Sequence, residues 1–223
     1  MNPPNPAPNY RKLRLRNITS PEFNHLLLLF GWVGYFILYF LTENLIPREA
    51  CFRIHIFLDD LIPFCEVFVV PYVFWYFLIV WSLVYFAIYD VASFRKLMVF
   101  LIVTQITAMA IYILFPNRQD LRPKVFPREN IFTSVIGWLY ALDTDTNVCP
   151  SLHVAFSIGI ASVWLKRKRS RAATKIFIVL CAVLICLSTV FIKQHSALDG
   201  IAAIPVCLLA EFICYPIPQK RKK

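Results

Sequence analysis

The chain has 223 residues, of which 59% are hydrophobic, 16% are aromatic and 16% are charged, and its formal net charge is +10. Its mean hydropathy of +0.62 is far above the value expected of a soluble domain of this length. Only five glycines and seven cysteines are present, which excludes collagen-like, low-complexity and disulfide-stapled secreted proteins. These values predict a membrane protein with a single domain.

Six apolar runs follow one another along the chain, each close to the length that crosses a hydrocarbon core of about 30 Å. They cover residues 26–45, 67–89, 97–115, 151–165, 176–192 and 198–213. The last three are short, so we expect their outer ends to continue into structured protein. A helix satisfies its own backbone hydrogen bonds in lipid, and the sequence therefore predicts an all-α bundle of six transmembrane helices. This membrane domain would span residues 25–215, between tails at 1–24 and 216–223.

Two of the predicted outer loops are longer than simple connections. Residues 116–150 separate the third and fourth runs, and within them residues 130–142 have the pattern of an amphipathic helix. We expect this helix to lie at the membrane interface. The earlier loop, residues 46–66, could cover a site or be merely solvated, because it carries three acids among apolar residues: Asp59, Asp60 and Glu66.

Basic residues are distributed unevenly among the segments between the runs. If the amino terminus is cytoplasmic, sixteen of the 23 lysines and arginines fall in cytoplasmic segments, many of them between residues 166 and 175. The positive-inside rule therefore predicts that both termini are cytoplasmic. The net charge is then a consequence of topology, so we expect contact with anionic membrane lipids and no nucleic-acid partner.

Polar residues gather at three predicted span ends, all on the outer side. Residues 117–123 follow the third run, residues 149–153 open the fourth, and residues 193–199 precede the sixth. Ionisable groups at a membrane edge are costly unless they are paired or functional. Because the three clusters share one side of the bilayer, the sequence predicts a common outer pocket.

The residue types in these clusters favour acid–base and phosphoryl chemistry. His195 and Asp199 are four residues apart, so one helix face carries both, and the carboxylate can fix the tautomer of the imidazole. His153 lies just inside a predicted helix start, where it is placed to act as a general acid. Ser151 is expected to cap that helix, whose free N–H groups would face an anion.

Two basic residues near these clusters bear on whether the site binds a phosphate or a metal ion. Arg122 and Lys193 could bind phosphoryl oxygens, whereas a metal site built from two histidines and an aspartate is the rival hypothesis. Because the two basic groups disfavour a cation, we expect neither a metal nor another cofactor. An anion channel or transporter and a non-catalytic scaffold are the non-enzymatic alternatives. Ionisable residues are absent from the middle of every run, which argues against a channel.

In this order, the clusters resemble the three signature motifs of the type 2 phosphatidic acid phosphatase superfamily. That superfamily includes six-span lipid phosphatases, inositol phosphorylceramide and sphingomyelin synthases and soluble vanadium haloperoxidase relatives. Arg122 and Pro123 match the end of the first motif, residues 150–153 match the Pro-Ser-Gly-His motif, and the third motif is matched by Ser188, His195 and Asp199. The resemblance implies a metal-independent phosphoesterase that acts on a lipid phosphate or phospholipid.

The same resemblance implies a role for each matched residue. His195 would be the nucleophile, Asp199 its orienting partner and His153 the acid for the leaving group. Phosphoryl oxygens would be bound by Ser151 and Arg122.

Three positions depart from the family pattern. Phe115 stands where the first motif has Lys, so that phosphate contact is either absent or supplied by Arg118. Leu152 replaces Gly, which takes away backbone freedom but leaves the next backbone N–H available to an anion. Thr189 replaces Arg, for which Lys193 is the expected substitute. The motifs look closer to the inositol phosphorylceramide synthase-like branch, so hydrolysis, transfer to a lipid hydroxyl and an inactive relative all stay open.

The charge distribution generates a topology test. A single cysteine placed between residues 166 and 175 of a cysteine-depleted variant should resist membrane-impermeant thiol reagents in intact cells, because that loop is predicted to be cytoplasmic. The measurement is labelling before and after permeabilisation. Ready labelling of intact cells would invert the topology.

Overall fold

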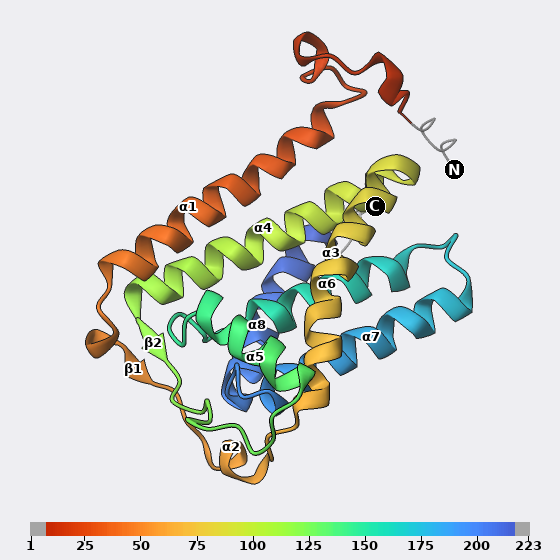
Figure 1. The fold of residues 1–223 in the computed structure, drawn as a ribbon. Helices are drawn as coiled ribbons and strands as arrows, with labels where there is room; N and C mark the ends of the chain where they lie inside the picture. The colour runs from red at the N-terminus through yellow and green to blue at the C-terminus, as the bar shows by residue number, and fades with distance from the viewer. Residues whose placement is uncertain (1–7, 217–223) are drawn as a thin grey trace, which may run out of the picture.

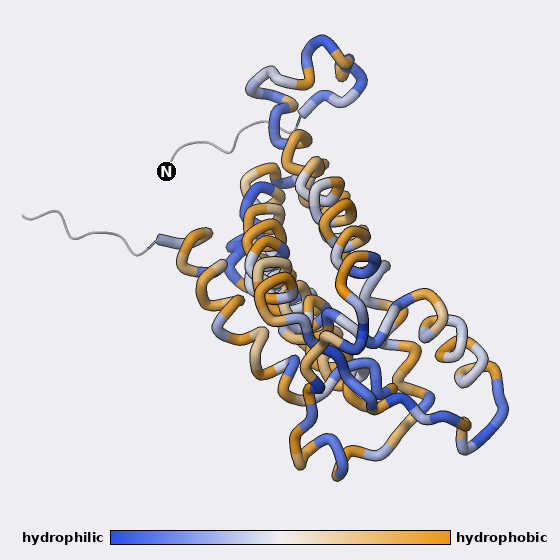
Figure 2. The backbone as a smooth tube through the Cα atoms, turned by 90° about the vertical axis from the view of Figure 1, so that its left-hand side faces the viewer, coloured by the Kyte–Doolittle hydropathy of each residue, from blue (hydrophilic) through white to orange (hydrophobic). Residues whose placement is uncertain are grey.

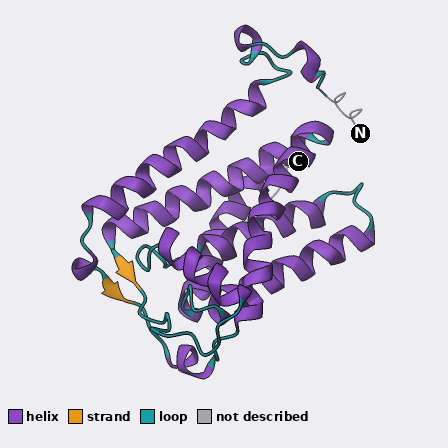
Figure 3. Ribbon diagram, viewed as in Figure 1, coloured by secondary structure: helices purple, strands orange, loops and turns teal. Residues whose placement is uncertain are grey.

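The computed structural model describes residues 8–216, and its regular elements are helices apart from one two-stranded ladder (Figure 3). The longer helices are α1 (Phe30–Leu45), α3 (Val69–Tyr89), α4 (Val91–Leu114), α5 (Ile131–Leu142), α6 (Leu152–Lys166), α7 (Ala172–Phe191) and α8 (Ala197–Cys214). The short elements are α2 (Phe57–Leu61), the parallel strands β1 (Phe52–Arg53) and β2 (Asn117–Arg118), and 3-10 helices at Tyr10–Lys12, Leu15–Asn17, Asn24–Leu29, Arg48–Ala50 and Glu66–Phe68. Residues 1–7 and 217–223 of the two predicted tails lie outside the described residues.

Within residues 8–216, five helical stretches are long and apolar enough to cross a membrane. They are Asn24–Leu45, Glu66–Tyr89, Val91–Leu114, Ala172–Phe191 and Ala197–Cys214. The fourth predicted span is α6, which has only 15 residues and a length of about 22 Å. It is short because a capping serine precedes it and a run of basic residues follows it. The structure thus has five candidate membrane-spanning helices among the described residues, and a six-span count stays a prediction.

Helix α6 is the centre of the bundle. It packs against α3, α4, α7 and α8, and α1 lies along α4 at the edge (Figure 1). The shared core includes Leu97, Phe100 and Leu101 from α4 and Phe156 and Ile160 from α6, all at most 1% exposed. The outward faces of the peripheral helices carry exposed Phe, Leu, Ile and Val side chains, which suit lipid rather than water. The chain is therefore a multi-pass membrane protein.

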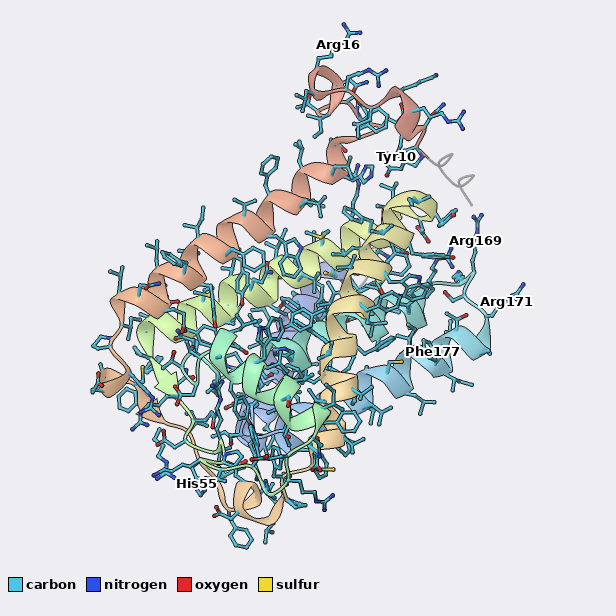
Figure 4. The ribbon with its side chains drawn as sticks, viewed as in Figure 1. Tyr10, Arg16, His55, Arg169, Arg171 and Phe177 are labelled. Carbon is cyan, nitrogen blue, oxygen red and sulfur yellow. The ribbon has the colours of Figure 1, made fainter. Side chains whose placement is uncertain are left out.

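Labelled polar side chains mark the two ends of the bundle. Arg16, Arg169 and Arg171 lie at the end where α1 begins and α6 finishes, and His55 lies at the opposite end (Figure 4). Hydrophilic backbone segments collect at the ends, whereas the helices between them are mostly hydrophobic (Figure 2). This arrangement agrees with the predicted grouping of basic residues. Which end faces the cytoplasm stays a prediction.

The predicted amphipathic helix in the long loop is formed as α5. The side chain of Asn130 caps it by accepting hydrogen bonds from the backbone N–H groups of Phe132 (2.9 Å) and Thr133 (3.1 Å). Ile136 and Leu139 are buried in a small core with the start of α3. Trp138 on the other face is 64% exposed, which suits an interfacial position, although docking to the membrane stays a prediction.

Close packing of α4 against α6 generates a stability prediction. A Cβ atom at Gly159 would overlap the ring of the fully buried Phe100, whose Cε1 would lie 2.6 Å away. We therefore expect Gly159→Ala to destabilise the protein by about 1–3 kcal/mol, because overpacking must shift a buried ring. The measurement is the midpoint of thermal unfolding in detergent. Gly34→Ala is the matched control, since nothing lies within 4 Å of a Cβ there; equal midpoints for the two variants would contradict the packing.

Candidate active site

Two helix starts bring the second and third polar clusters together. Ser151 caps α6 as predicted, with its Oγ accepting from the N–H of Val154 (3.4 Å), and His153 follows in the first turn. Ser196 caps α8, and Asp199 lies in that first turn. The backbone N–H of Ser151 donates to the carbonyl oxygen of Asp199 at 3.0 Å. This bond joins the two helix starts directly.

His195 and Asp199 form the predicted pair. Nδ1 of His195 lies 3.0 Å from Oδ2 of Asp199, whose side chain is fully buried. The same oxygen accepts from the backbone N–H of Ser196 (3.0 Å). A carboxylate only accepts, so Nδ1 of His195 carries the proton and Nε2 keeps the lone pair in the neutral ring. Asp199 thereby fixes both the orientation and the tautomer of His195.

The second histidine meets the free nitrogen of the first. Nδ1 of His153 lies 3.4 Å from Nε2 of His195, and the residues are 9% and 7% exposed. The ring of His153 packs against two aromatic side chains of α3, with centroids 4.5 Å from Tyr72 and 4.1 Å from Trp75. Asp199, His195 and His153 thus form a buried hydrogen-bonded line that ends in an imidazole able to give or take a proton.

Both histidines line a cavity of about 540 Å³ between α1, α3 and the starts of α6 and α8. Most of its wall is aromatic or aliphatic, and the residues that provide this surface include Trp32, Tyr35, Phe36, Tyr39, Trp75, Tyr76, Ile79 and Leu83. Leu152, at the position that departs from the family pattern, also lines it. Among the described residues, no lysine or arginine belongs to this lining. The site is therefore a polar corner at the end of an apolar cavity.

The predicted basic residues lie outside the cavity lining and bind protein groups. The guanidinium of Arg122 donates to the carbonyls of Tyr140, Asp143 and Thr144 at 2.7–3.1 Å and so closes the end of α5. The ammonium of Lys193 donates to the carbonyls of Asp59 (2.8 Å) and Ile62, and burial lowers its pKa. Arg118 pairs with Asp120. The structure therefore does not bring Arg118 and Lys193 to the two histidines, and phosphate binding by Arg122 stays a prediction.

The segment before Ser151 is fixed by Asn117. Its Oδ1 accepts from the N–H groups of Val148 (3.0 Å) and Cys149 (2.8 Å), and its Nδ2 donates to the carbonyl of Cys149 (2.9 Å). The hydroxyl of Tyr112 donates to the carbonyl of Pro150 at 2.6 Å. Burial, reinforced by the charge of Asp199, raises the pKa of the Cys149 thiol to about 12, so this cysteine is not a nucleophile at neutral pH.

An acidic side chain from the earlier loop holds the other helix start. Asp59 is 3% exposed and accepts from the Ser196 hydroxyl (2.6 Å) and the Ala197 N–H (2.8 Å). Lys193 adopts φ = 55°, a left-handed conformation that its bonds to the carbonyls of Asp59 and Ile62 help to hold. The sequence left the role of Asp59 open, because nothing local signals a partner 137 residues away.

The fold and this histidine pair define a class of helical membrane proteins with a buried acid–base site at one end of the bundle. A family model described as the PAP2 superfamily matches residues 95–223, more than half of the chain. The chain belongs to the PAP2 superfamily. No curated protein and no solved structure shows a significant match. Members of the superfamily are generally phosphatases, which supports phosphoesterase activity.

The contacts of Asp59 generate a prediction about the site. Asp59→Ala should lower the thermal unfolding midpoint in detergent, because the buried Ser196 hydroxyl and Ala197 N–H lose their acceptor, at about 1–3 kcal/mol for each unpaired group. Asp59→Asn should recover part of the loss, since an amide oxygen still accepts. Asp60→Ala is the control: its partner is His55 and its side chain is 62% exposed. A loss in the control as large as that in Asp59→Ala would contradict the stabilising role of the Asp59 contacts with Ser196 and Ala197.

Proposed function

We propose that this protein is a membrane lipid phosphatase that works through a phosphohistidine intermediate on His195. The observation that carries the proposal is the hydrogen-bonded line Asp199–His195–His153 at the wall of an apolar cavity. A membrane location and PAP2 membership support phosphoester chemistry on an amphiphilic substrate.

In the first step, the Nε2 lone pair of His195 attacks phosphorus, and the bond from phosphorus to the leaving-group oxygen breaks. Asp199 stabilises the positive charge that develops on the ring, through the hydrogen bond at Nδ1 (3.0 Å). In the structure, Nδ1 of His153 lies 3.4 Å from Nε2 of His195. An entering phosphoryl group would replace this contact. The leaving group then lies beside His153, whose imidazolium form donates a proton to the leaving-group oxygen and becomes neutral.

In the second step, an acceptor hydroxyl attacks the phosphorylated His195. His153 takes the proton from that hydroxyl, the P–N bond breaks, and both histidines return to their starting states. With water as the acceptor the product is inorganic phosphate, and with a lipid hydroxyl it is a new phospholipid. Phosphoryl oxygens would be bound by N–H groups at the start of α6 near Ser151 and stabilised by the helix dipole. Arg122, behind the cavity wall, would add positive potential.

Lipid specificity is proposed from the shape of the cavity. Aromatic side chains of α1 and aliphatic side chains of α3 line it, and α1 packs along α4. An alkyl chain between α1 and α3 would bury apolar surface at about 25 cal/mol per Å² while its phosphate reached the histidines. Among the described residues, no group of three or more His, Cys, Asp or Glu side chains is placed to hold a metal ion. The proposed mechanism uses none.

The proposal is tested by trapping the intermediate. Wild-type protein, incubated with a lipid monoester labelled at phosphorus and quenched in alkaline detergent, should carry label on His195, located by peptide mass. His195→Ala should lose both the label and phosphate release. Asp199→Asn should lower the rate by about 10²-fold or more, because the wrong tautomer is held.

His55→Ala is the matched control, because His55 also pairs with an aspartate (2.9 Å to Asp60) but does not line the cavity. This variant should keep full activity. A fully active His195→Ala variant would contradict the mechanism. A wild-type protein that releases no phosphate from any lipid phosphate would favour transfer or an inactive scaffold.

A further inference from the structure

Hydrogen-bond acceptors line the part of the cavity next to His195. Asp143, at the end of α5, accepts from the hydroxyl of Tyr39 (3.1 Å) and from Nε2 of Gln194 (2.7 Å). It forms no ion pair within residues 8–216, and no lysine or arginine of that range belongs to the cavity lining. A carboxylate here, without a paired cation, makes this part of the cavity unfavourable for a second anion.

Two buried amides beside Asp143 have a defined orientation. Nδ2 of Asn147 donates to Glu43, and Nε2 of Gln194 donates to Asp143. Since a carboxylate only accepts, each amino group must face its acid and each carbonyl oxygen must face away. Oδ1 of Asn147 and Oε1 of Gln194 have no partner among the described residues, although these residues are 7% and 2% exposed. Buried acceptors without a partner are costly, so they point to a missing donor.

We infer that Asp143, Asn147 and Gln194, together the acceptor subsite, bind a substrate head group that donates hydrogen bonds. The inference rests on the proposed phosphoester chemistry at His195. Gln194 directly precedes His195 and bonds to Asp143, so a phosphoryl group at His195 brings its polar substituent to this subsite. An ammonium or a hydroxyl group fits these acceptors. A second phosphate or carboxylate does not, because it would meet Asp143.

The test measures binding, which does not require turnover. Trp32 and Trp75 line the cavity, so ligands are titrated against tryptophan fluorescence. The probes are dioctanoyl lipids that differ only in head group: phosphoethanolamine, phosphoglycerol, phosphocholine and diphosphate. Phosphoethanolamine and phosphoglycerol should bind at least about five-fold more tightly than phosphocholine, which has no N–H or O–H donor, as one hydrogen bond predicts. Diphosphate should bind most weakly.

Matched variants connect this preference to the subsite. Gln194→Met should abolish the preference for donor head groups. Gln105→Met is the control, because Gln105 is also buried with an unpartnered amide nitrogen but does not line the cavity. Asp143→Asn, which keeps the side-chain shape, should tighten diphosphate binding. This variant tests the subsite if Gln194→Met does not fold.

Three results would overturn the inference: equal affinity for the choline and ethanolamine lipids, tightest binding of the diphosphate, or an unchanged preference in Gln194→Met and Asp143→Asn. Tighter ethanolamine than glycerol binding identifies ammonium as the donor, and the reverse identifies hydroxyl. A head-group preference in a protein that releases no phosphate from the lipid monoester used above would contradict the proposed function alone. Phosphate release without a head-group preference would contradict this inference alone.

Discussion

Asp199 is the residue on which the site depends. Its carboxylate holds Nδ1 of His195 and the backbone of Ser196, and its carbonyl oxygen holds the N–H of Ser151. One residue therefore sets the start of α8, the start of α6 and the tautomer of the proposed nucleophile. Because the side chain is fully buried, the two hydrogen bonds at Oδ2 replace part of the solvation that a carboxylate loses at high cost, whereas Oδ1 has no partner among the described residues.

The remainder of the fold keeps this arrangement in place from several directions. Asn117 and Tyr112 fix the segment that leads into α6, and Asp59 fixes the segment that leads into α8. The apolar bundle supplies rigid helices, and polar contacts at one end bring the starts of α6 and α8 together. This division matches the membrane environment, where apolar packing is tolerated throughout and buried polar groups are costly unless they are paired or functional.

Local patterns in the sequence predicted the helices and part of the site. Apolar runs located the long helices, and the spacing of His195 and Asp199 predicted their contact, because both features are set within one or two turns. Of the six predicted spans, five are long enough to be candidates, because α6 is buried and shorter than a hydrocarbon core. Partners distant in sequence were not predictable. Lys193 is predicted to contact the phosphate but bonds to the carbonyls of residues 59 and 62, and no local signal marks the contact of Gln194 with Asp143, 51 residues away.

The central claim is that Nε2 of His195 is the atom that bonds to phosphorus. A structure of the protein with vanadate, which adopts the five-coordinate geometry of a phosphoryl transition state, tests this most directly. The account predicts vanadium bonded to Nε2 of His195, with Asp199 still at Nδ1 and His153 beside a vanadate oxygen. Vanadium bonded to His153, or vanadate held outside the cavity with the two histidines still in contact, would contradict it.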